Sequence, residues 1–437
     1  MPGRTALQKS AARVPLFPQM STEAGRALAL LPEALSRVRP LNLSHRRSLP
    51  EDAASLSRLL TVERGELRRP YWSSPAFVSA YLYYFLPWNL LRLVPLLTAL
   101  PLPDPRCAAP AGGEVLLLDV GSGPLTLPLA LWLARPEWGD APVRILALDS
   151  ASQPLDLGRK LFAALGEMLG RKIWPVLTAA SPVEQLARRA APAFSGGRVR
   201  PWLVTAANVL NELHCDRCAS DFARSGDGVP SRYGAERFEN LLEVLSPLLS
   251  LQRRAEGAGT ATGRSDAAPA LLVVEPGTRL GGKTLMRLRA TALAGGFAAL
   301  APCSHSSACP LLAGDGGRTW CHFTFGSGGA PEWLRRLSAA AGLDKKALSL
   351  SALLLRQASG LRQEAGSAGR ARVLSAPFVV PGLAGRARYA CADGGLLLLE
   401  DAEGLACGDL IHARVSPDAP RDAKSRARIV RRASLLY

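Results

Sequence analysis

Val115-Leu-Leu-Leu-Asp119-Val-Gly121-Ser-Gly123-Pro-Leu125 is the stretch of sequence that decides the fold of this chain. Its apolar residues predict a buried strand and its glycines a tight turn, and the apolar segment at 126–134 predicts a helix. Strand, glycine turn and helix N-terminus form the element with which α/β proteins bind nucleotide-like ligands. The dinucleotide fingerprint has a third glycine that is missing here, which disfavours a pyrophosphate ligand. An acid just ahead of the glycines favours S-adenosylmethionine (SAM), a cationic cofactor without phosphate. The alternative interpretation is a merely structural turn.

Strands and helices continue to alternate after the glycine turn. Short apolar strands are expected at 144–148, 202–208 and 270–274, and a helix is expected at 153–169. Strands separated by helices predict a parallel sheet with right-handed crossovers. In such a sheet, ligands bind at the carboxyl ends of the strands. The expected core is therefore α/β and Rossmann-like.

Polar residues fall at those expected strand ends. Asp149 is placed to accept hydrogen bonds from ribose hydroxyls. Asp119, Gly121, Gly123 and Asp149 are therefore the expected cofactor-binding residues. Asn208 is the candidate catalytic residue, because its side-chain carbonyl would hydrogen-bond a substrate amino group facing the methyl of SAM. The alternative is that Asn208 caps the following helix. Methyl transfer needs alignment more than acid–base help, so the lack of an obvious histidine base is no objection.

Charge and composition point to a polyanionic partner. The 437 residues carry a formal charge of +17, with 48% hydrophobic and 20% charged residues, which is typical of a globular protein. Such a charge favours nucleic acid or an anionic membrane surface, although heavy Arg and Ala usage also suits a GC-rich genome. The best apolar span, at 83–100, is interrupted by prolines, Asn89 and Arg92, so a membrane partner is not expected.

The N-terminus and the cysteines give indications of the cellular compartment of the protein. Residues 1–22 are basic and lack a secretory apolar core, which is compatible with a mitochondrial transit peptide. Three prolines there disfavour an amphipathic helix, so we expect a flexible basic N-terminus in a bacterial cytoplasmic protein, with the mitochondrial matrix as the alternative. Eight cysteines without a secretory signal indicate a reducing compartment.

Four regions are expected along the chain. They are a helical N-terminal region at 1–110, a Rossmann-like SAM-binding domain at 111–300, a Cys-rich metal-binding region at 301–370 and a small, basic, β-rich domain at 371–437. Aromatic residues crowd 71–88, where they favour a helical core over a base-stacking surface.

Two cysteine groups are candidates for metal or redox chemistry. The first is Cys303-x5-Cys309-x11-Cys321, with Cys391 far downstream. Four cysteines suit zinc or an iron–sulfur cluster, but these spacings match neither a zinc ribbon nor a ferredoxin loop, so scattered core cysteines remain an equal alternative. The second is Cys215-x2-Cys218, for which a redox or metal role is the weaker hypothesis.

The C-terminus from 421 to 432 is strongly basic. In a strand, alternation would place Lys424, Arg426 and Arg428 on one face and form a track for RNA phosphates. The alternative is a solvated edge strand blunted by its charges. The overall charge favours RNA contact.

Taken together, these motifs resemble a family, the methyltransferase-like assembly factors of the mitochondrial small ribosomal subunit and their bacterial relatives. The likeness extends from about residue 71 to the C-terminus. The matching pieces are Leu118-Asp-Val-Gly-Ser-Gly-Pro124, Val209-Leu-Asn-Glu-Leu213, Val274-Glu-Pro-Gly-Thr278, Ala301-Pro-Cys-x5-Cys309 and Trp320-Cys-His-Phe323.

The resemblance implies a SAM-type core, a [4Fe–4S] cluster on Cys303, Cys309, Cys321 and Cys391, and binding to small-subunit rRNA during ribosome assembly. A monomer is expected. Leu125 departs from the many SAM loops that have a third glycine, and this puts catalysis in doubt. The main alternative is an inactive rRNA-binding assembly factor with a structural iron–sulfur or zinc site, and a small-molecule methyltransferase is a weaker one.

Overall fold

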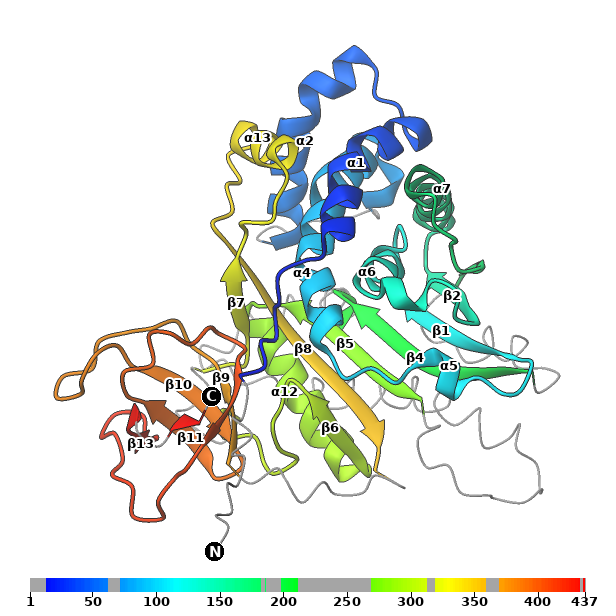
Figure 1. The fold of residues 1–437 in the computed structure, drawn as a ribbon. Coiled ribbons are helices and arrows are strands. Elements are labelled where there is room, and N and C mark those ends of the chain that lie inside the picture. The colour runs from blue at the N-terminus through cyan, green and yellow to red at the C-terminus, as the bar shows by residue number, and fades with distance from the viewer. Residues whose placement is uncertain are drawn as a thin grey trace, which may run out of the picture.

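A long twisted sheet organises the molecule (Figure 1). The computed structural model describes residues 13–61, 71–181, 185, 198–210, 269–312, 319–358, 369–432 and 435–436. The sheet has the strand order β3-β2-β1-β4-β5-β8-β6, and β7 pairs with β8. Strands β1 to β5 are mutually parallel, whereas β8 runs antiparallel to both β5 and β6. The expected α/β fold with a parallel sheet is confirmed.

The strands of this sheet are short and apolar. They are β1 (Glu114–Val120), β2 (Val143–Asp149), β3 (Val176–Ala180), β4 (Val199–Ala207), β5 (Ala270–Pro276), β6 (Phe297–Ala301), β7 (Phe323–Gly326) and β8 (Ala347–Gln357). The order of β1 to β5 reverses between β1 and β4. In doubly wound folds, ligands bind at the strand carboxyl ends beside such a reversal.

The large sheet extends beyond the domain boundary expected at residue 300. The Rossmann-like domain was expected to end at residue 300, but β7 and β8 come from beyond it and complete the large sheet. Residues 350–355 of β8 are all buried, and β8 lies between β5 and β6 in the sheet. The region at 301–370 is thus built into the sheet instead of standing apart as a metal-binding unit.

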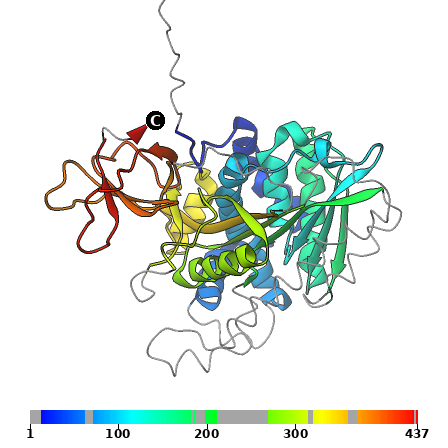
Figure 2. The ribbon, with the colours of Figure 1, turned by 90° about the horizontal axis from the view of Figure 1, so that it is seen from below.

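Helices cover both faces of the sheet (Figures 1 and 2). The N-terminal helices, α6 and α7 lie on one face, and α12 lies across the other, as the view from below shows. The helices and helical turns are α1 (Thr22–Val38), α2 (Leu43–Thr61), η2 (Tyr71–Ser73), α3 (Pro75–Ala80), η3 (Tyr81–Phe85), α4 (Leu86–Ala99), α5 (Pro105–Ala108), α6 (Thr126–Ala134), η4 (Pro136–Trp138), α7 (Ser152–Leu169), α12 (Arg279–Ala294) and α13 (Glu332–Ala340).

The N-terminal helices share one apolar core with the sheet. Leu31 of α1, Leu90 of α4 and Leu131 of α6 are completely buried in it together with strand residues. Helix α6 is apolar on every side because α4 and the sheet enclose it. The crowded aromatics mostly belong to this core as expected, since Trp72, Tyr83, Tyr84 and Trp88 are at most 9% exposed. Among the described helices, none combines the length and apolar character needed to span a membrane.

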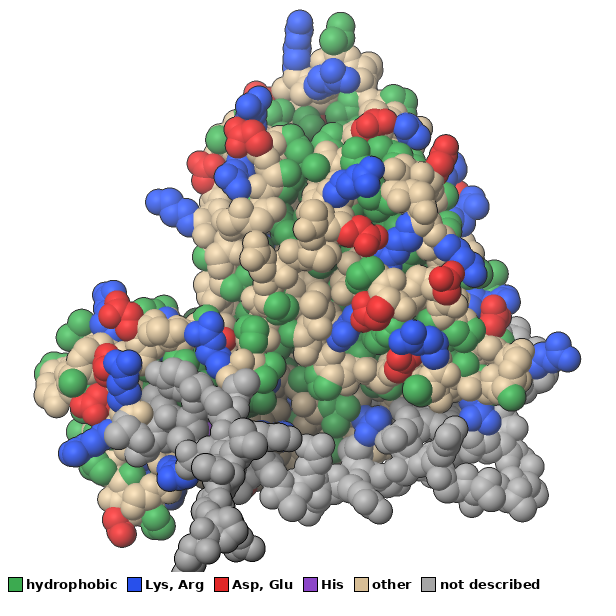
Figure 3. Space-filling model, viewed as in Figure 1, with side chains coloured by type: hydrophobic (Ala, Val, Ile, Leu, Met, Phe, Trp, Pro, Cys, Tyr) green, Lys and Arg blue, Asp and Glu red, His purple; other side chains and the backbone are tan. Residues whose placement is uncertain are grey.

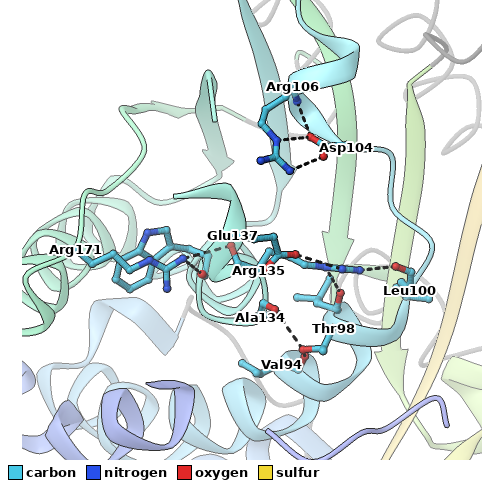
Figure 4. A network of polar contacts seen from close by, with 11 residues as sticks. Val94, Thr98, Leu100, Asp104, Arg106, Ala134, Arg135, Glu137 and Arg171 are labelled. Carbon is cyan, nitrogen blue, oxygen red and sulfur yellow. Dashed lines mark hydrogen bonds and ion pairs between the residues drawn. The ribbon is translucent and has the colours of Figure 1, made fainter. Parts of the chain in front are cut away.

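A polar network joins α4 to α6 where both helices end (Figure 4). The Arg135 guanidinium donates to the carbonyl oxygens of Leu97 and Leu100 at 3.0 and 2.6 Å. Arg171 donates to the carbonyl of Trp132 at 2.6 Å and stacks over its ring. These arginines bind helix-terminal carbonyls that lack an intrahelical partner, so both helices end at defined points.

The second sheet is small and lies to one side of the first (Figures 1 and 2). Its order is β13-β11-β10-β9-β12-β14, and it is antiparallel except between β11 and β13. A small, largely antiparallel C-terminal sheet was expected. Its strands are β9 (Arg370–Val373), β10 (Arg388–Ala392), β11 (Gly395–Leu399), β12 (Leu410–Ala413), β13 (Arg428–Val430) and β14 (Leu435–Leu436).

Residues 13–17 run from the small sheet to the large one. Val14 bridges Leu410 of β12, Leu16 is 3% exposed, and Phe17 stacks on Phe325 of β7 at 4.0 Å between ring centroids. Arg13 forms an ion pair with the buried Asp409 at 3.4 Å. The expected flexible N-terminus is therefore wrong from residue 13 onward, because its apolar side chains pack between the two sheets.

Candidate functional site

The glycine turn lies at the carboxyl end of β1, beside the reversal of strand order. Gly121 and Gly123 have φ angles of 63° and 52°, a region that glycine adopts without strain. A Cβ on Gly121 would lie 2.3 Å from the Cγ2 atom of Val209, so a side chain there requires its surroundings to shift. Gly158 of α7 packs equally closely on the loop, where a Cβ would lie 2.3 Å from the carbonyl carbon of Pro124. The loop is thus held from two sides.

Asp149 ends β2 and holds the loop directly. One carboxylate oxygen accepts from the Gly123 amide at 2.8 Å, and the other accepts from the Ala151 amide at 3.0 Å. The sequence predicted a contact between Asp149 and ribose hydroxyls. The structure instead shows Asp149 bound to the loop backbone. The oxygen that accepts from Gly123 retains a second lone pair for such a contact, while the other also accepts from the Ser150 hydroxyl at 3.5 Å.

Asp119 lies beneath the turn. Its side chain is 1% exposed and accepts a 2.5 Å hydrogen bond from the Thr205 hydroxyl of β4. Burial raises the pKa of Asp119 to about 7. The acid that the sequence predicted to face a ligand is therefore covered by protein.

Asn208 follows β4 at the same edge. Its φ of 61° is left-handed, which asparagine tolerates better than most residues. Its backbone N–H donates to the Val274 carbonyl at 2.8 Å. The next strand end holds Glu275, which is fully buried and accepts from the Leu210 amide at 2.9 Å. The structure thus gathers Asp119, Asp149 and Asn208 at one edge. The pieces at 211–218, including Cys215 and Cys218, lie outside the described residues.

Leu125 occupies a backbone position that suits glycine. Its φ of 57° is left-handed, and its side chain is completely buried in the main core. We expect Leu125→Ala and Leu125→Gly both to destabilise the protein, by about 2–5 kcal/mol, because both remove the buried side-chain atoms beyond Cβ. Glycine also relieves about 1 kcal/mol of left-handed strain, so Leu125→Gly is expected to be the more stable variant.

Urea unfolding of the two purified variants measures that order. A more stable alanine variant would show that the left-handed backbone at residue 125 carries no strain, since alanine is otherwise the better residue in a helical first turn.

The cysteines form a second candidate site between the two sheets. Cys303 and Cys309 follow β6, Cys321 precedes β7, and Cys391 belongs to β10 of the small sheet. All four are free thiols. Burial raises the pKa of Cys303, Cys321 and Cys391, and the charges of the neighbouring thiols raise these pKa values further. The four cysteines therefore lie near one another, although seventy residues separate the last two.

Two buried arginines flank these thiols. Arg289 of α12 is 3% exposed and donates to the His305 carbonyl at 2.7 Å, while its Nε atom has no hydrogen-bond partner within the described ranges. Arg372 of β9 is 8% exposed and donates to the Pro302 carbonyl at 2.7 Å. In the described part of the chain, neither guanidinium has a carboxylate within ion-pair distance. Buried charges need counter-charges, and thiolates at Cys303 and its neighbours would supply them.

Two further contacts involve the cysteine residues themselves. His305 Nε2 lies 3.3 Å from Cys391 Sγ, and its Nδ1 atom is buried without a partner. The Cys321 carbonyl accepts from the Ser351 hydroxyl at 2.7 Å. Within the described ranges, no three Cys, His, Asp or Glu side chains converge closely enough to hold a single metal ion.

The basic C-terminal segment does not form the expected track. Lys424 lies in a turn, Arg426 has a φ of 60°, and Arg428 alone belongs to β13. Asp422 causes the turn, because its carboxylate accepts from the amide and the hydroxyl of Ser425 at 2.7 and 2.6 Å. The expectation that one strand aligns the three cations is therefore wrong, although Lys424 and Arg426 are exposed.

The surface seen in Figure 3 carries both signs of charge. Lys and Arg side chains are interspersed there with Asp and Glu side chains. On this face the net charge of +17 does not gather into one large basic patch.

Several residues of these sites were not predicted from the sequence. Thr205, Arg289 and Arg372 lie within apolar or mixed segments and carry no motif, so nothing in the sequence relates Thr205 to Asp119 or either arginine to the cysteines. Trp72 lies against the glycine turn, where a Cβ on Gly123 would be 3.7 Å from its ring. The sequence places Trp72 ahead of a predicted core helix, and no pattern there predicts its contact with the glycine turn.

The family resemblance noted in the sequence is confirmed by a family model. Residues 244–329 match the model of the mitochondrial small ribosomal subunit protein Rsm22. This stretch includes Cys303, Cys309 and Cys321, but neither the glycine turn nor Cys391. Among curated proteins, none matches the chain.

Solved methyltransferase structures show a weak likeness. A type I restriction-modification methyltransferase subunit from Streptococcus thermophilus is 13% identical with a TM-score of 0.24, and the match covers 48% of this chain and 38% of that one. The bifunctional kinase-methyltransferase WbdD is 10% identical with a TM-score of 0.24, over 72% and 48%. A geranyl diphosphate C-methyltransferase from Streptomyces coelicolor A3(2) is 11% identical with a TM-score of 0.22, over 58% and 77%. The chain thus spans less than half the length of the first two proteins, and such low TM-scores assign neither a fold nor an activity.

Proposed function

We propose that this protein is a SAM-binding, methyltransferase-like factor that acts on the rRNA of the small ribosomal subunit. The observation that carries the proposal is the glycine turn at the reversal of strand order, where Asp149 holds the Gly123 amide. Gly121 and Gly123 give the cofactor close access to the backbone, one Asp149 oxygen retains a lone pair for its ribose, and Asp119 supplies negative charge below it. The Thr126 hydroxyl is buried beside the turn and has no hydrogen-bond partner in the described part of the chain, so it is one further group for the ligand.

SAM binding is expected to strengthen as the pH rises from 6 to 7. Since the pKa of Asp119 is about 7, its carboxyl is mostly neutral at pH 6 and half ionised at pH 7. A cationic ligand favours the ionised form, so the affinity rises by at most about fivefold over this range. The amino group of SAM stays largely protonated there. Isothermal titration at the two pH values measures the effect.

Asp119→Asn is the matched control, because it keeps an acceptor for Thr205 and cannot ionise. We expect its SAM affinity to be independent of pH from 6 to 7. Failure of the folded wild-type protein to bind SAM at either pH would refute the cofactor assignment.

Asn208 is proposed to align the methyl acceptor, since it lies at the same strand edge as the cofactor turn. The transfer of labelled methyl from SAM to small-subunit rRNA tests this activity. Binding of SAM and subunit without transfer would favour the inactive assembly factor. In that case, a Gly121→Arg and Asp149→Ala double variant that stays folded would still support assembly.

Cys303, Cys309, Cys321 and Cys391 are proposed to hold a [4Fe–4S] cluster. The donor set is four thiols, and two buried arginines offset its negative charge. A zinc site draws four ligands to about 2.3 Å from one ion, whereas these side chains do not converge on one point. A cluster places its thiolates around a larger core, so it fits better than zinc. It would serve as a structural link between the sheets.

RNA contact is proposed for the exposed Lys424 and Arg426, with Arg428 beside them. The Rsm22 description supports the small ribosomal subunit as the partner and the mitochondrial matrix as the compartment, in place of the bacterial cytoplasm. A steep loss of RNA affinity with added salt is expected. Weak salt dependence would favour a small-molecule methyltransferase.

A further inference from the structure

A π-helical turn, η3, stands between α3 and α4 and presents a stack of aromatic rings. Tyr81 is nearly parallel to Tyr71 and to Phe85, with centroids 5.9 and 5.8 Å away and interplanar angles of 18° and 26°. All three side chains are partly exposed. π-helical turns are rare and occur often at functional sites. Stacked, partly exposed rings of this kind are platforms on which nucleobases stack.

This aromatic stack begins at the cofactor turn. The ring of Trp72 lies 4.8 Å from that of Tyr81, and the same ring faces Gly123. A group bound on the stack would therefore be a neighbour of the cofactor. The stack lies apart from Lys424 and Arg426, which precede β13 of the small sheet (Figure 1).

Two cations lie at the far end of the stack. Tyr84 adjoins Phe85 at 5.1 Å, and Lys345 Nζ lies 5.7 Å from the centroid of Tyr84. Lys345 lies just ahead of β8, whose first residues lie at the carboxyl end of β5, the edge that also holds the cofactor turn. Arg92 of α4 donates to Asn89 at 3.1 Å, and its buried Nε has no hydrogen-bond partner among the described residues.

Arg92 and Lys345 carry like charges that repel each other. Burial and the charge of Arg92 together lower the pKa of Lys345 to about 8. Neither side chain forms an ion pair with an acid among the residues that the structure describes. Two half-buried cations without an acid are unfavourable, and a bound phosphate would relieve both by charge-assisted hydrogen bonds.

We propose that this stack and cation pair form a subsite for one nucleotide of single-stranded RNA, with its base on the Tyr71–Tyr81–Phe85 rings and its phosphate between Arg92 and Lys345. The inference rests on the proposed function, because it places the RNA beside the cofactor. An unpaired strand is required, since bases within a duplex cannot stack on side chains.

Fluorescence anisotropy with a short unstructured RNA tests the subsite. Removing two phosphate contacts lowers the slope of log affinity against log salt by about 1.4, because each contact contributes about 0.7 in a single strand. We expect Arg92→Gln/Lys345→Gln to show this change and about tenfold weaker binding at low salt. Lys346→Gln is the matched control, since Lys346 is the exposed neighbour and should change the affinity less than twofold. Equal effects of the double variant and Lys346→Gln would overturn the proposal.

Lys345 also gives the subsite a pH signature. Above pH 8 its ammonium loses its proton, so the RNA affinity falls between pH 7 and 9 in the wild type but not in Lys345→Gln. Of the other groups that face Lys345, Tyr84 does not titrate in this range, because burial raises its pKa to about 12. The remaining charged neighbours are Arg92 and the exposed Asp344.

Crosslinking of RNA that contains 4-thiouridine locates the base. Crosslinks at Tyr71, Tyr81 or Phe85 are expected. Crosslinks confined to the segment at 421–432 would refute the subsite while leaving the proposed RNA binding intact. A separate SAM titration of the double variant should match the wild type, so a failure of the cofactor assignment is distinguished from a failure of the subsite.

Discussion

Gly121→Ala is expected to weaken SAM binding by about a hundredfold and to destabilise the protein by at least about 3 kcal/mol. The added Cβ would lie 2.3 Å from Val209 Cγ2, so the turn or the β4 end must shift by roughly an ångström. Misplacement of that size costs about a hundredfold at a preorganised site. The left-handed φ of 63° adds about 1–2 kcal/mol of strain to the overpacking. Titration with SAM and urea unfolding measure the two effects.

Two other glycines separate the clash from the strain. Gly112 has the same φ with no neighbour within 4 Å, so Gly112→Ala reports strain alone, far from the turn. Gly123→Ala meets only an ordinary contact with Trp72, so its loss of stability should resemble that of Gly112→Ala. SAM affinity in Gly121→Ala equal to that in Gly112→Ala would show that the turn does not hold the cofactor.

The glycine turn could be predicted from the sequence because each of its features is local. An apolar run, two glycines at short spacing and a following apolar segment specify strand, turn and helix without long-range information. Asp149 was likewise predicted to end its strand, and the structure places it there. Its bond to the Gly123 amide could not be predicted, because a carboxylate at a strand end suits a ligand hydroxyl and a loop amide equally.

What the sequence could not specify depends on contacts between distant segments. The apolar run of β8 carries no sign that it would insert antiparallel between β5 and β6. Lys424, Arg426 and Arg428 do not share one strand, because the turn at Asp422 interrupts the extended chain before β13. Arg289 approaches the thiols from helix α12 and Arg372 approaches them from β9 of the small sheet, and no local pattern relates the two arginines.

Cys321→Ser is expected to remove bound iron and the broad visible absorption of the proposed cluster. The protein should also lose about 4 kcal/mol of stability, because a bound group contributes its binding free energy to folding and removal of one ligand leaves two buried arginines without full counter-charge. Anaerobic purification, iron and sulfide analysis and thermal unfolding measure these changes. Cys407→Ser is the matched control, since Cys407 lies nearby and already donates to the Leu374 carbonyl at 3.2 Å.

The position of Cys391 makes a sharper expectation possible. Because it belongs to β10 of the small sheet and the other three thiols lie beside the large sheet, a cluster on all four would cross-link the two sheets. Hydrogen exchange in Cys321→Ser should therefore rise together in the described segment around Cys303 and in β10, while the contact of residues 13–17 keeps the sheets associated. Faster exchange on one side alone, or zinc in place of iron in the wild type, would contradict a shared iron–sulfur cluster.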